Sequence, residues 1–268
     1  MNGIYEKVEI ITSNQNPYIK IFRQLANSGR YRKKEGQTVL HGVHLVESYM
    51  NSSKVLDSIA VTSTALMNAE VGVILSRAIK IGVPIKQLPA SLDKLVSGVD
   101  SGVSIAAIIN IPEARPPETI EESAVLLDRI QDPGNLGGIL RVAAASGIKK
   151  VFCSEGTTSV WSPKSLRAGM GAQLGLEIYE QVSLKSLLAL SSVPVYATAL
   201  NGKKSLYDLD LSGPTAWLFG NEGQGVDNGL LNSGVELVII PQEDSIESLN
   251  VATAVAVCLF EQRRQAIG

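Results

Sequence analysis

The sequence predicts a two-domain α/β protein whose second half is an open, mostly parallel sheet, and three observations support this. The chain has 268 residues, 45% of them hydrophobic, which is more than one domain usually needs and enough for two cores. Short apolar runs alternate with stretches of helical periodicity along the whole chain. Between the halves, NIPEARPPETIEES combines three prolines with four acidic residues and no apolar periodicity, which is typical of a linker.

The first half reads as a small α/β domain over residues 1–112. Ile19, Ile21, Phe22 and Leu25 are spaced for a helix over 16–26, with capping candidates at 13–16. Strands are expected at 38–40, 59–61, 83–88 and 103–109, with helices at 43–50 and 71–79.

The second domain is expected over residues 124–268, after a linker at 113–123. Buried strands are predicted at 124–127, 150–153, 193–198, 215–219 and 235–240. Helices are predicted at 137–146, 163–172, 184–190 and 249–265, so strands and helices alternate as in a parallel sheet.

Several classes of protein are disfavoured by composition. No apolar run approaches the eighteen or so residues of a membrane span, and the first residues, MNGIYEKVEI, lack a signal pattern, so we expect a cytoplasmic protein. Cys153 and Cys258 lie far apart in apolar surroundings and are expected in the core. His41 and His44 lack further ligands nearby, so no metal site is expected and both are interpreted as structural or RNA-facing.

Charge is distributed unevenly. The net charge is −2, which disfavours a wholly basic nucleic-acid binder, yet residues 1–115 hold 13 Lys and Arg against 9 Asp and Glu. The clearest cationic cluster surrounds Tyr31, and it fits an RNA-binding surface or a solvated helix end. Its members, with two cations upstream, are Lys20, Arg23, Arg30, Arg32, Lys33 and Lys34.

Three segments rich in glycine and asparagine follow predicted strands of the second half, where ligands bind in parallel sheets. In the first, Asn135 is the expected N-cap of a helix that presents Arg141 six residues later. Glu222 lies in the second, GNEGQGV, and Ser248 and Asn250 begin a helix in the third. Taken singly, such glycine-rich turns are weak signals, and capping and packing explain each equally well.

Read together, LLDRIQDPGNLGGILRVAAASG, WLFGNEGQGV and IIPQEDSIESLNVATAVAV resemble the SpoU family of RNA ribose methyltransferases in the SPOUT superfamily. SPKSLRAGMGA, YATALNGKKSLYDLDL and SNQNPYIKIFRQL extend the resemblance over nearly the whole chain. It implies an enzyme that methylates RNA ribose 2′-oxygens with S-adenosylmethionine, a C-terminal trefoil knot and a homodimer. A dinucleotide-dependent oxidoreductase is disfavoured because DPGNLGG has the wrong glycine spacing.

The resemblance also assigns roles to residues. Arg141 would orient the ribose and stabilise its alkoxide, because a guanidinium is a poor base. Glu222 would support Asn135, and Ser248 and Asn250 would position Arg141, in the family across a dimer interface. The cofactor would lie against Thr198, Ala199, Leu200, Gly220, Asn221, Gly225, Ile240 and Leu249.

RNA contacts are expected from the cluster around Tyr31 and from Lys164 and Arg167, which share a helix face that also fits a plain surface helix. The first domain resembles the substrate-binding domain of the rRNA-acting branch, which favours 23S rRNA over tRNA. An inactive RNA-binding ribosome assembly factor on the same scaffold is the alternative from another class.

Four positions depart from the usual family pattern. Asp244 stands where family members carry glycine, Gln242 where methionine is usual, Gly169 where serine is usual and His41 where glutamate is usual. Asp244 adds negative charge close to the expected cofactor or RNA, so it bears on the identity of the substrate.

Overall fold

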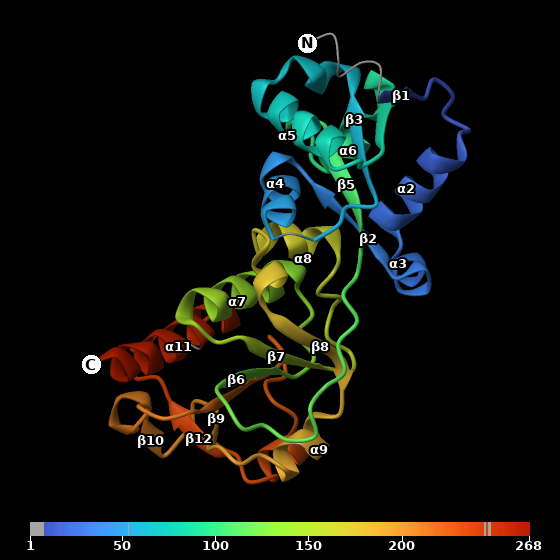
Figure 1. Ribbon diagram of the computed structural model, residues 1–268. Coiled ribbons are helices and arrows are strands. Elements are labelled where there is room, and N and C mark those ends of the chain that lie inside the picture. Colours follow the sequence, from blue (N-terminus) through green and yellow to red (C-terminus); the bar gives the residue numbers. More distant parts are fainter. Residues whose placement is uncertain (1–7, 53, 244, 246–247) are drawn as a thin grey trace. The chain divides into compact units, whose positions relative to one another are not determined.

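The computed structural model describes residues 8–52, 54–243, 245 and 248–268, and they form two compact units (Figure 1). The N-terminal unit comprises the described residues up to Pro112 together with Trp161–Leu174, and the C-terminal unit comprises Glu113–Val160 with the described residues from Gly175 onward. Residues 161–174 were expected in the second domain, so the structure departs from the sequence-based boundary there. Asp244 lies outside the described residues.

A five-stranded mixed sheet forms the centre of the N-terminal unit, in the order β1-β4-β3-β5-β2. β1, β4 and β3 run parallel, whereas β5 is antiparallel to both β3 and β2. The strands are β1 (Val8–Ile10), β2 (Gln37–His41), β3 (Ser58–Thr62), β4 (Ile85–Leu88) and β5 (Ile105–Asn110).

The helices of this unit cover the sheet. α2 packs on β2 through Ile19, Phe22 and Leu25, which are fully buried, and Asn16 caps it by accepting from the Tyr18 amide. The helices are α2 (Pro17–Asn27), α3 (Gly29–Glu35), α4 (Val43–Asn51), α5 (Ala69–Lys80), α6 (Asp93–Ser97) and α8 (Pro163–Ala168), with 3-10 turns η1 (Ser63–Met67), η2 (Ala90–Leu92) and η3 (Ala172–Gly175), the last ending at the unit boundary.

Side-chain contacts explain why residues 161–174 belong to the N-terminal unit. The Thr38 hydroxyl donates to the Trp161 carbonyl at 2.7 Å, and Lys54 Nζ donates to the Leu174 carbonyl at 3.0 Å. The Arg167 guanidinium donates to the Gly98 carbonyl at 3.0 Å. Both ends and the middle of the segment are therefore fixed to this unit.

The Gln173 side chain packs closely against Gly169. A Cβ atom there would lie 2.6 Å from Gln173 Oε1, and the buried Gln173 side chain is held by a hydrogen bond to the Ser165 carbonyl. Gln173 thus fills the space that the usual serine of the family would need, which gives this departure a packing explanation.

His41 is buried at the end of β2, with its ring nearly perpendicular to the Phe22 ring. Its Nδ1 lies 2.8 Å from the Val96 carbonyl oxygen. Burial lowers the His41 pKa from 6.5 to about 4, the Val96 hydrogen bond opposes this shift, and the Arg167 charge adds to it. His41 is therefore a neutral structural residue at physiological pH.

This predicts a loss of stability at mildly acidic pH. Between about pH 6.5 and about pH 4 the unfolded chain protonates His41 and the folded one does not, so the free energy of unfolding should fall as pH falls through this window. His41→Asn keeps a donor near the Val96 carbonyl and should remove up to about 3 kcal/mol of this pH dependence. Urea unfolding at several pH values measures it, with His44→Asn as control. If the free energy of unfolding of His41→Asn changed with pH as steeply as that of the wild type, the lowered pKa assigned to His41 would be contradicted.

All seven strands of the C-terminal unit are parallel, in the order β10-β12-β9-β11-β6-β7-β8. Trp217, Phe219 and Phe152 are buried along its centre. The strands are β6 (Ala124–Leu127), β7 (Lys150–Ser154), β8 (Glu177–Val182), β9 (Val195–Thr198), β10 (Lys204–Ser205), β11 (Ala216–Phe219) and β12 (Glu236–Ile239).

α7 and α11 pack against each other on this sheet (Figure 1). α11 is fixed by the Gln262 side chain, which accepts from the Trp217 indole and donates to Ser123. The helices are α7 (Pro133–Ser146), α9 (Leu184–Ala189), α10 (Asn228–Leu231) and α11 (Val251–Ile267), with a 3-10 turn η4 (Leu206–Asp208).

Other expectations are settled by burial. Cys153 and Cys258 are buried, as predicted, and burial raises the pKa of both thiols. Ile120, expected within the linker, is instead buried in the core of the C-terminal unit. Across the described part of the chain, no helix is both long and apolar enough to cross a bilayer.

Candidate cofactor and RNA site

A cavity of about 790 Å³ opens at the carboxyl ends of β9, β11 and β12, where the three glycine- and asparagine-rich segments meet. Such strand ends are the usual ligand sites of parallel sheets. All eight residues predicted to hold the cofactor lie on its wall, with Asn135, Glu222, Ser248 and Asn250. The sequence did not predict the remaining residues of the wall, which are Phe219, Gly223, Gln224, Val226, Asn228, Leu231, Ile239, Gln242, Val251 and Ala254.

Gly220 shapes this wall because it admits a close backbone approach. A Cβ atom at Gly220 would lie 2.1 Å from the Val226 nitrogen and 2.2 Å from the Gly225 carbonyl carbon. Asn221 and Gly225 exchange two backbone hydrogen bonds, and Gly225 has φ +68°. The loop 220–227, hereafter the cofactor loop, is thereby a tight turn with its backbone exposed to the cavity.

Glu222 connects the cofactor loop to the start of α7. Its carboxylate accepts from the Gln131 and Asp132 amides and from Asn135 Nδ2, each at 3.1 Å. Burial raises the Glu222 pKa, but these donors outweigh it and the net pKa is lowered, so the group is a carboxylate at neutral pH.

Asn135 is the central member of a chain of hydrogen bonds. Its amide donates to Glu222, and its Oδ1 accepts from Asn250 Nδ2 at 2.9 Å. Asn250 in turn caps α11 by accepting from the amides of Ala252 and Thr253. Because each amide both donates and accepts, the orientations of Asn135 and Asn250 are fixed.

One expectation about the first segment is wrong. The N-cap of α7 is Asp132, whose side chain accepts from the Asn135 amide, so the helix begins at Pro133 and not after Asn135. Asn250 contacts Asn135 within the chain, and its role in positioning Arg141, in the family across a dimer interface, stays a prediction. Arg141 is exposed on α7 and is absent from the residues that line the cavity.

The cations predicted to bind RNA all lie in the N-terminal unit, Lys164 and Arg167 included. Lys20, Arg23 and Arg30 are exposed on α2 and α3, as are Lys33 and Lys34. The structure contradicts the expectation that Arg32 binds RNA. Arg32 is 8% exposed and its guanidinium donates to the Leu25 carbonyl at 2.8 Å, so it joins α3 to α2.

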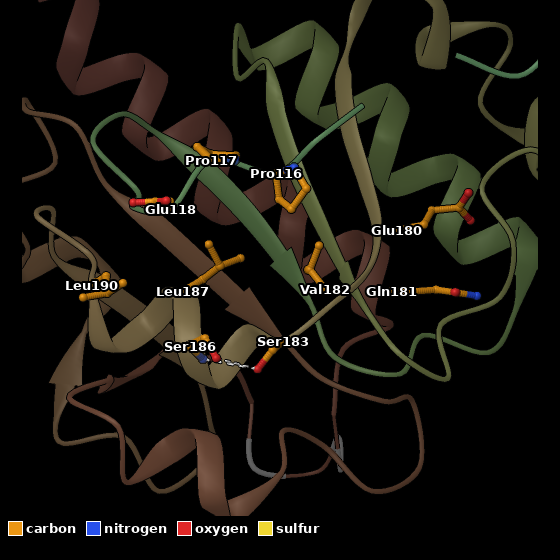
Figure 2. A pocket seen from close by; sticks show the side chains of 10 residues that line it. All are labelled: Pro116, Pro117, Glu118, Glu180, Gln181, Val182, Ser183, Ser186, Leu187 and Leu190. Carbon is orange, nitrogen blue, oxygen red and sulfur yellow. Dashed lines mark hydrogen bonds between the residues drawn. The ribbon is translucent and has the colours of Figure 1, made fainter. Parts of the chain in front are cut away.

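A second cavity of the C-terminal unit, about 550 Å³, differs in chemistry (Figure 2). Figure 2 shows Pro116 and Pro117 facing Val182 and Leu187, with Glu118 at the rim. Its wall has no cation and none of the predicted site residues, so it suits neither RNA phosphate nor the expected cofactor. Within the described chain no group of three or more His, Cys, Asp or Glu residues is placed to hold a metal.

Comparisons with known proteins agree with this architecture. Residues 122–260 match the model of the SpoU rRNA Methylase family. An uncharacterized tRNA/rRNA methyltransferase of Synechocystis is 35% identical, covering 99% of this chain and 97% of the relative. The 23S rRNA guanosine 2′-O-methyltransferase RlmP of Bacillus subtilis is 28% identical over 94% of this chain and 98% of its own length.

Solved structures are similar over both units. An rRNA methyltransferase from Sinorhizobium meliloti has a TM-score of 0.83 and 27% identity, covering 98% of this chain and all of that chain. Its form with bound AdoMet has a TM-score of 0.81 and 25% identity, with the same coverage. The family model and the full-length relative both include the three segments of the cavity, and the chain therefore belongs to the SpoU rRNA methylase family.

Proposed function

We propose that this protein transfers the methyl group of S-adenosylmethionine to a ribose 2′-oxygen of 23S rRNA. The observation that carries the proposal is the convergence of twelve predicted site residues on one cavity, within a chain of the SpoU family. Guanosine is the candidate nucleotide, because RlmP and several RlmB relatives are named as 23S rRNA guanosine 2′-O-methyltransferases.

The cavity fits the cofactor by its residues. Backbone groups at Gly220, Ile240 and Leu249, which all line the cavity, would hold the adenine end, as the resemblance implies. Thr198 and Leu200 would line the nucleoside. When bound, S-adenosylmethionine supplies an electrophilic methyl group for in-line transfer.

Catalysis by the chain is positioning and charge stabilisation. Arg141 would bind an RNA phosphate and stabilise the negative charge that develops on the ribose 2′-oxygen as the proton of the 2′-hydroxyl passes to phosphate or solvent. Asn135, fixed between Glu222 and Asn250, would set the position of the first turn of α7. Ser248, on the cavity wall, would help position Arg141.

Three further properties follow from the family resemblance. A trefoil knot is implied by the resemblance, and it would be formed at the cavity wall, where the segments that follow β9, β11 and β12 meet. A homodimer is implied by the family resemblance, and α11, on which Phe260 is 48% exposed, would contribute to its interface. The reaction would take place in the cytoplasm.

The N-terminal unit would bind the RNA through α2 and α3. Replacing Arg30 and Lys33 together by alanine should weaken binding to rRNA fragments about tenfold and lower the slope of log K against log salt by about 2, because two phosphate contacts are lost. Fluorescence anisotropy at several salt concentrations measures both quantities. Lys80→Ala removes an exposed cation at the end of α5 and is the matched control; an equal loss there would make the effect nonspecific.

The proposal is tested with labelled S-adenosylmethionine and rRNA or tRNA from cells lacking the enzyme. Digestion and mass spectrometry should then identify a ribose-methylated nucleoside from rRNA. Methylation of tRNA alone would favour a tRNA enzyme on the same scaffold. Binding of cofactor and RNA without transfer would favour an inactive ribosome assembly factor.

A further inference from the structure

Asp128, the residue that follows β6, is a carboxylate removed from solvent. It is 3% exposed, and a buried carboxylate persists only when donors surround it. Both oxygens accept from the Arg129 guanidinium, each at 3.0 Å, and Oδ2 also accepts from the Asp227 amide at 2.9 Å. Asp227 ends the cofactor loop, so this carboxylate fixes one end of that loop.

Arg129 fixes two further points of the same loop. Its carbonyl accepts from Asn221 Nδ2 at 2.9 Å, and its Nη1 donates to Gln224 Oε1 at 3.3 Å. Arg129 has φ +54°, a left-handed conformation uncommon for a residue with a side chain. Its amide donates to the Ser154 hydroxyl at 2.9 Å, so neighbouring contacts hold this backbone in place.

Asp128 and Arg129 therefore contact the cofactor loop at its start, middle and end, yet neither lies on the cofactor cavity wall. Both line a separate cavity of about 450 Å³, with Asp227. We propose that Asp128 and Arg129 are positioning residues that hold the cofactor loop in the shape that binds S-adenosylmethionine. This inference rests on the proposed function, since it assigns the loop to that cofactor.

Asp128 and Arg129 would raise the affinity for S-adenosylmethionine by preorganising the cofactor loop. A loop already held in its binding shape loses less conformational freedom when the ligand binds. Asn221 supports this assignment, because its side chain is turned into the loop, where Oδ1 accepts from the Gly223 and Gln224 amides while Nδ2 bonds Arg129. The Asn221 side chain, which was predicted to bind the cofactor, thus stabilises the conformation of the loop.

The first test is Asp128→Asn, which keeps the size of the side chain and removes its charge. We expect the dissociation constant for S-adenosylmethionine, measured by calorimetry, to rise about tenfold. The KM for the cofactor should rise more than kcat falls, and amide exchange of residues 221–227 should accelerate without a matching fall in Tm. Lys185→Ala is the control, because Lys185 lines the same 450 Å³ cavity and no hydrogen bond joins it to the described cofactor loop.

Arg129→Lys is the second variant and keeps a cation beside Asp128, which preserves the fold if Asp128→Asn does not fold. Lysine cannot bridge both Asp128 oxygens and Gln224, so a loss of affinity of about threefold or more is expected. Folded variants that bind S-adenosylmethionine within twofold of the wild type, or show unchanged exchange of the loop, would overturn the positioning role alone. A wild-type protein that binds no S-adenosylmethionine would overturn the proposed function and this inference together.

Discussion

Replacing Arg141 by alanine should lower the rate of methyl transfer about 100-fold to 1000-fold while changing the affinity for S-adenosylmethionine by less than about threefold. The expectation follows from its place: Arg141 is exposed on α7 and does not line the cofactor cavity. Because a guanidinium is a poor base, Arg141 would act by orienting RNA phosphate and stabilising the alkoxide. Both effects exist only when RNA is bound and reacting.

Single-turnover transfer with saturating RNA measures this rate, and calorimetry measures cofactor binding separately. Arg141→Lys keeps the charge but not the planar fork and should recover part of the rate. Lys149→Ala removes another exposed cation of the same unit and serves as control. Transfer by Arg141→Ala at the wild-type rate would exclude the catalytic role, and a loss of cofactor affinity would reassign Arg141 to the cofactor site.

The ligand cavity could be predicted because its signals are local. Gly220, Asn135 and Asn250 each follow an apolar run or begin a helix, and the carboxyl ends of parallel strands meet at one edge of a sheet. The structure brings them to one cavity wall. Assigning that cavity to a cofactor depended on the family resemblance, because spacing does not distinguish a methyl donor from another nucleoside.

Properties that depend on tertiary contacts could not be predicted. SPKSLRAGMGA has the pattern of an ordinary helix of the second domain, and tertiary contacts, such as those of Trp161 with Thr38 and of Arg167 with Gly98, place residues 161–174 in the N-terminal unit. Arg32 has the same charge as its neighbours, yet its guanidinium turns inward to the Leu25 carbonyl. The dipeptide sequence Asp128-Arg129 does not indicate that Arg129 adopts a positive φ next to the cofactor loop.

Gly220→Ala should weaken S-adenosylmethionine binding at least about 100-fold, which corresponds to about 2.7 kcal/mol. The new Cβ would lie 2.1 Å from the Val226 nitrogen and 2.2 Å from the Gly225 carbon. These are backbone atoms of a turn closed by the Asn221–Gly225 hydrogen bonds, so they cannot rotate away as a side chain would. The cofactor loop must shift as a whole, and the backbone groups that face the cavity shift with it.

Calorimetry with S-adenosylmethionine measures the effect, and Gly213→Ala is the matched control because its Cβ would meet open space before β11. RNA binding should persist in Gly220→Ala, since the exposed cations of α2 and α3 that are predicted to bind RNA lie in the N-terminal unit. If cofactor binding is lost while RNA binding stays intact, the C-terminal unit binds the cofactor and the N-terminal unit binds the RNA. Undiminished cofactor affinity in a folded Gly220→Ala protein would contradict the assignment of the cofactor to this cavity.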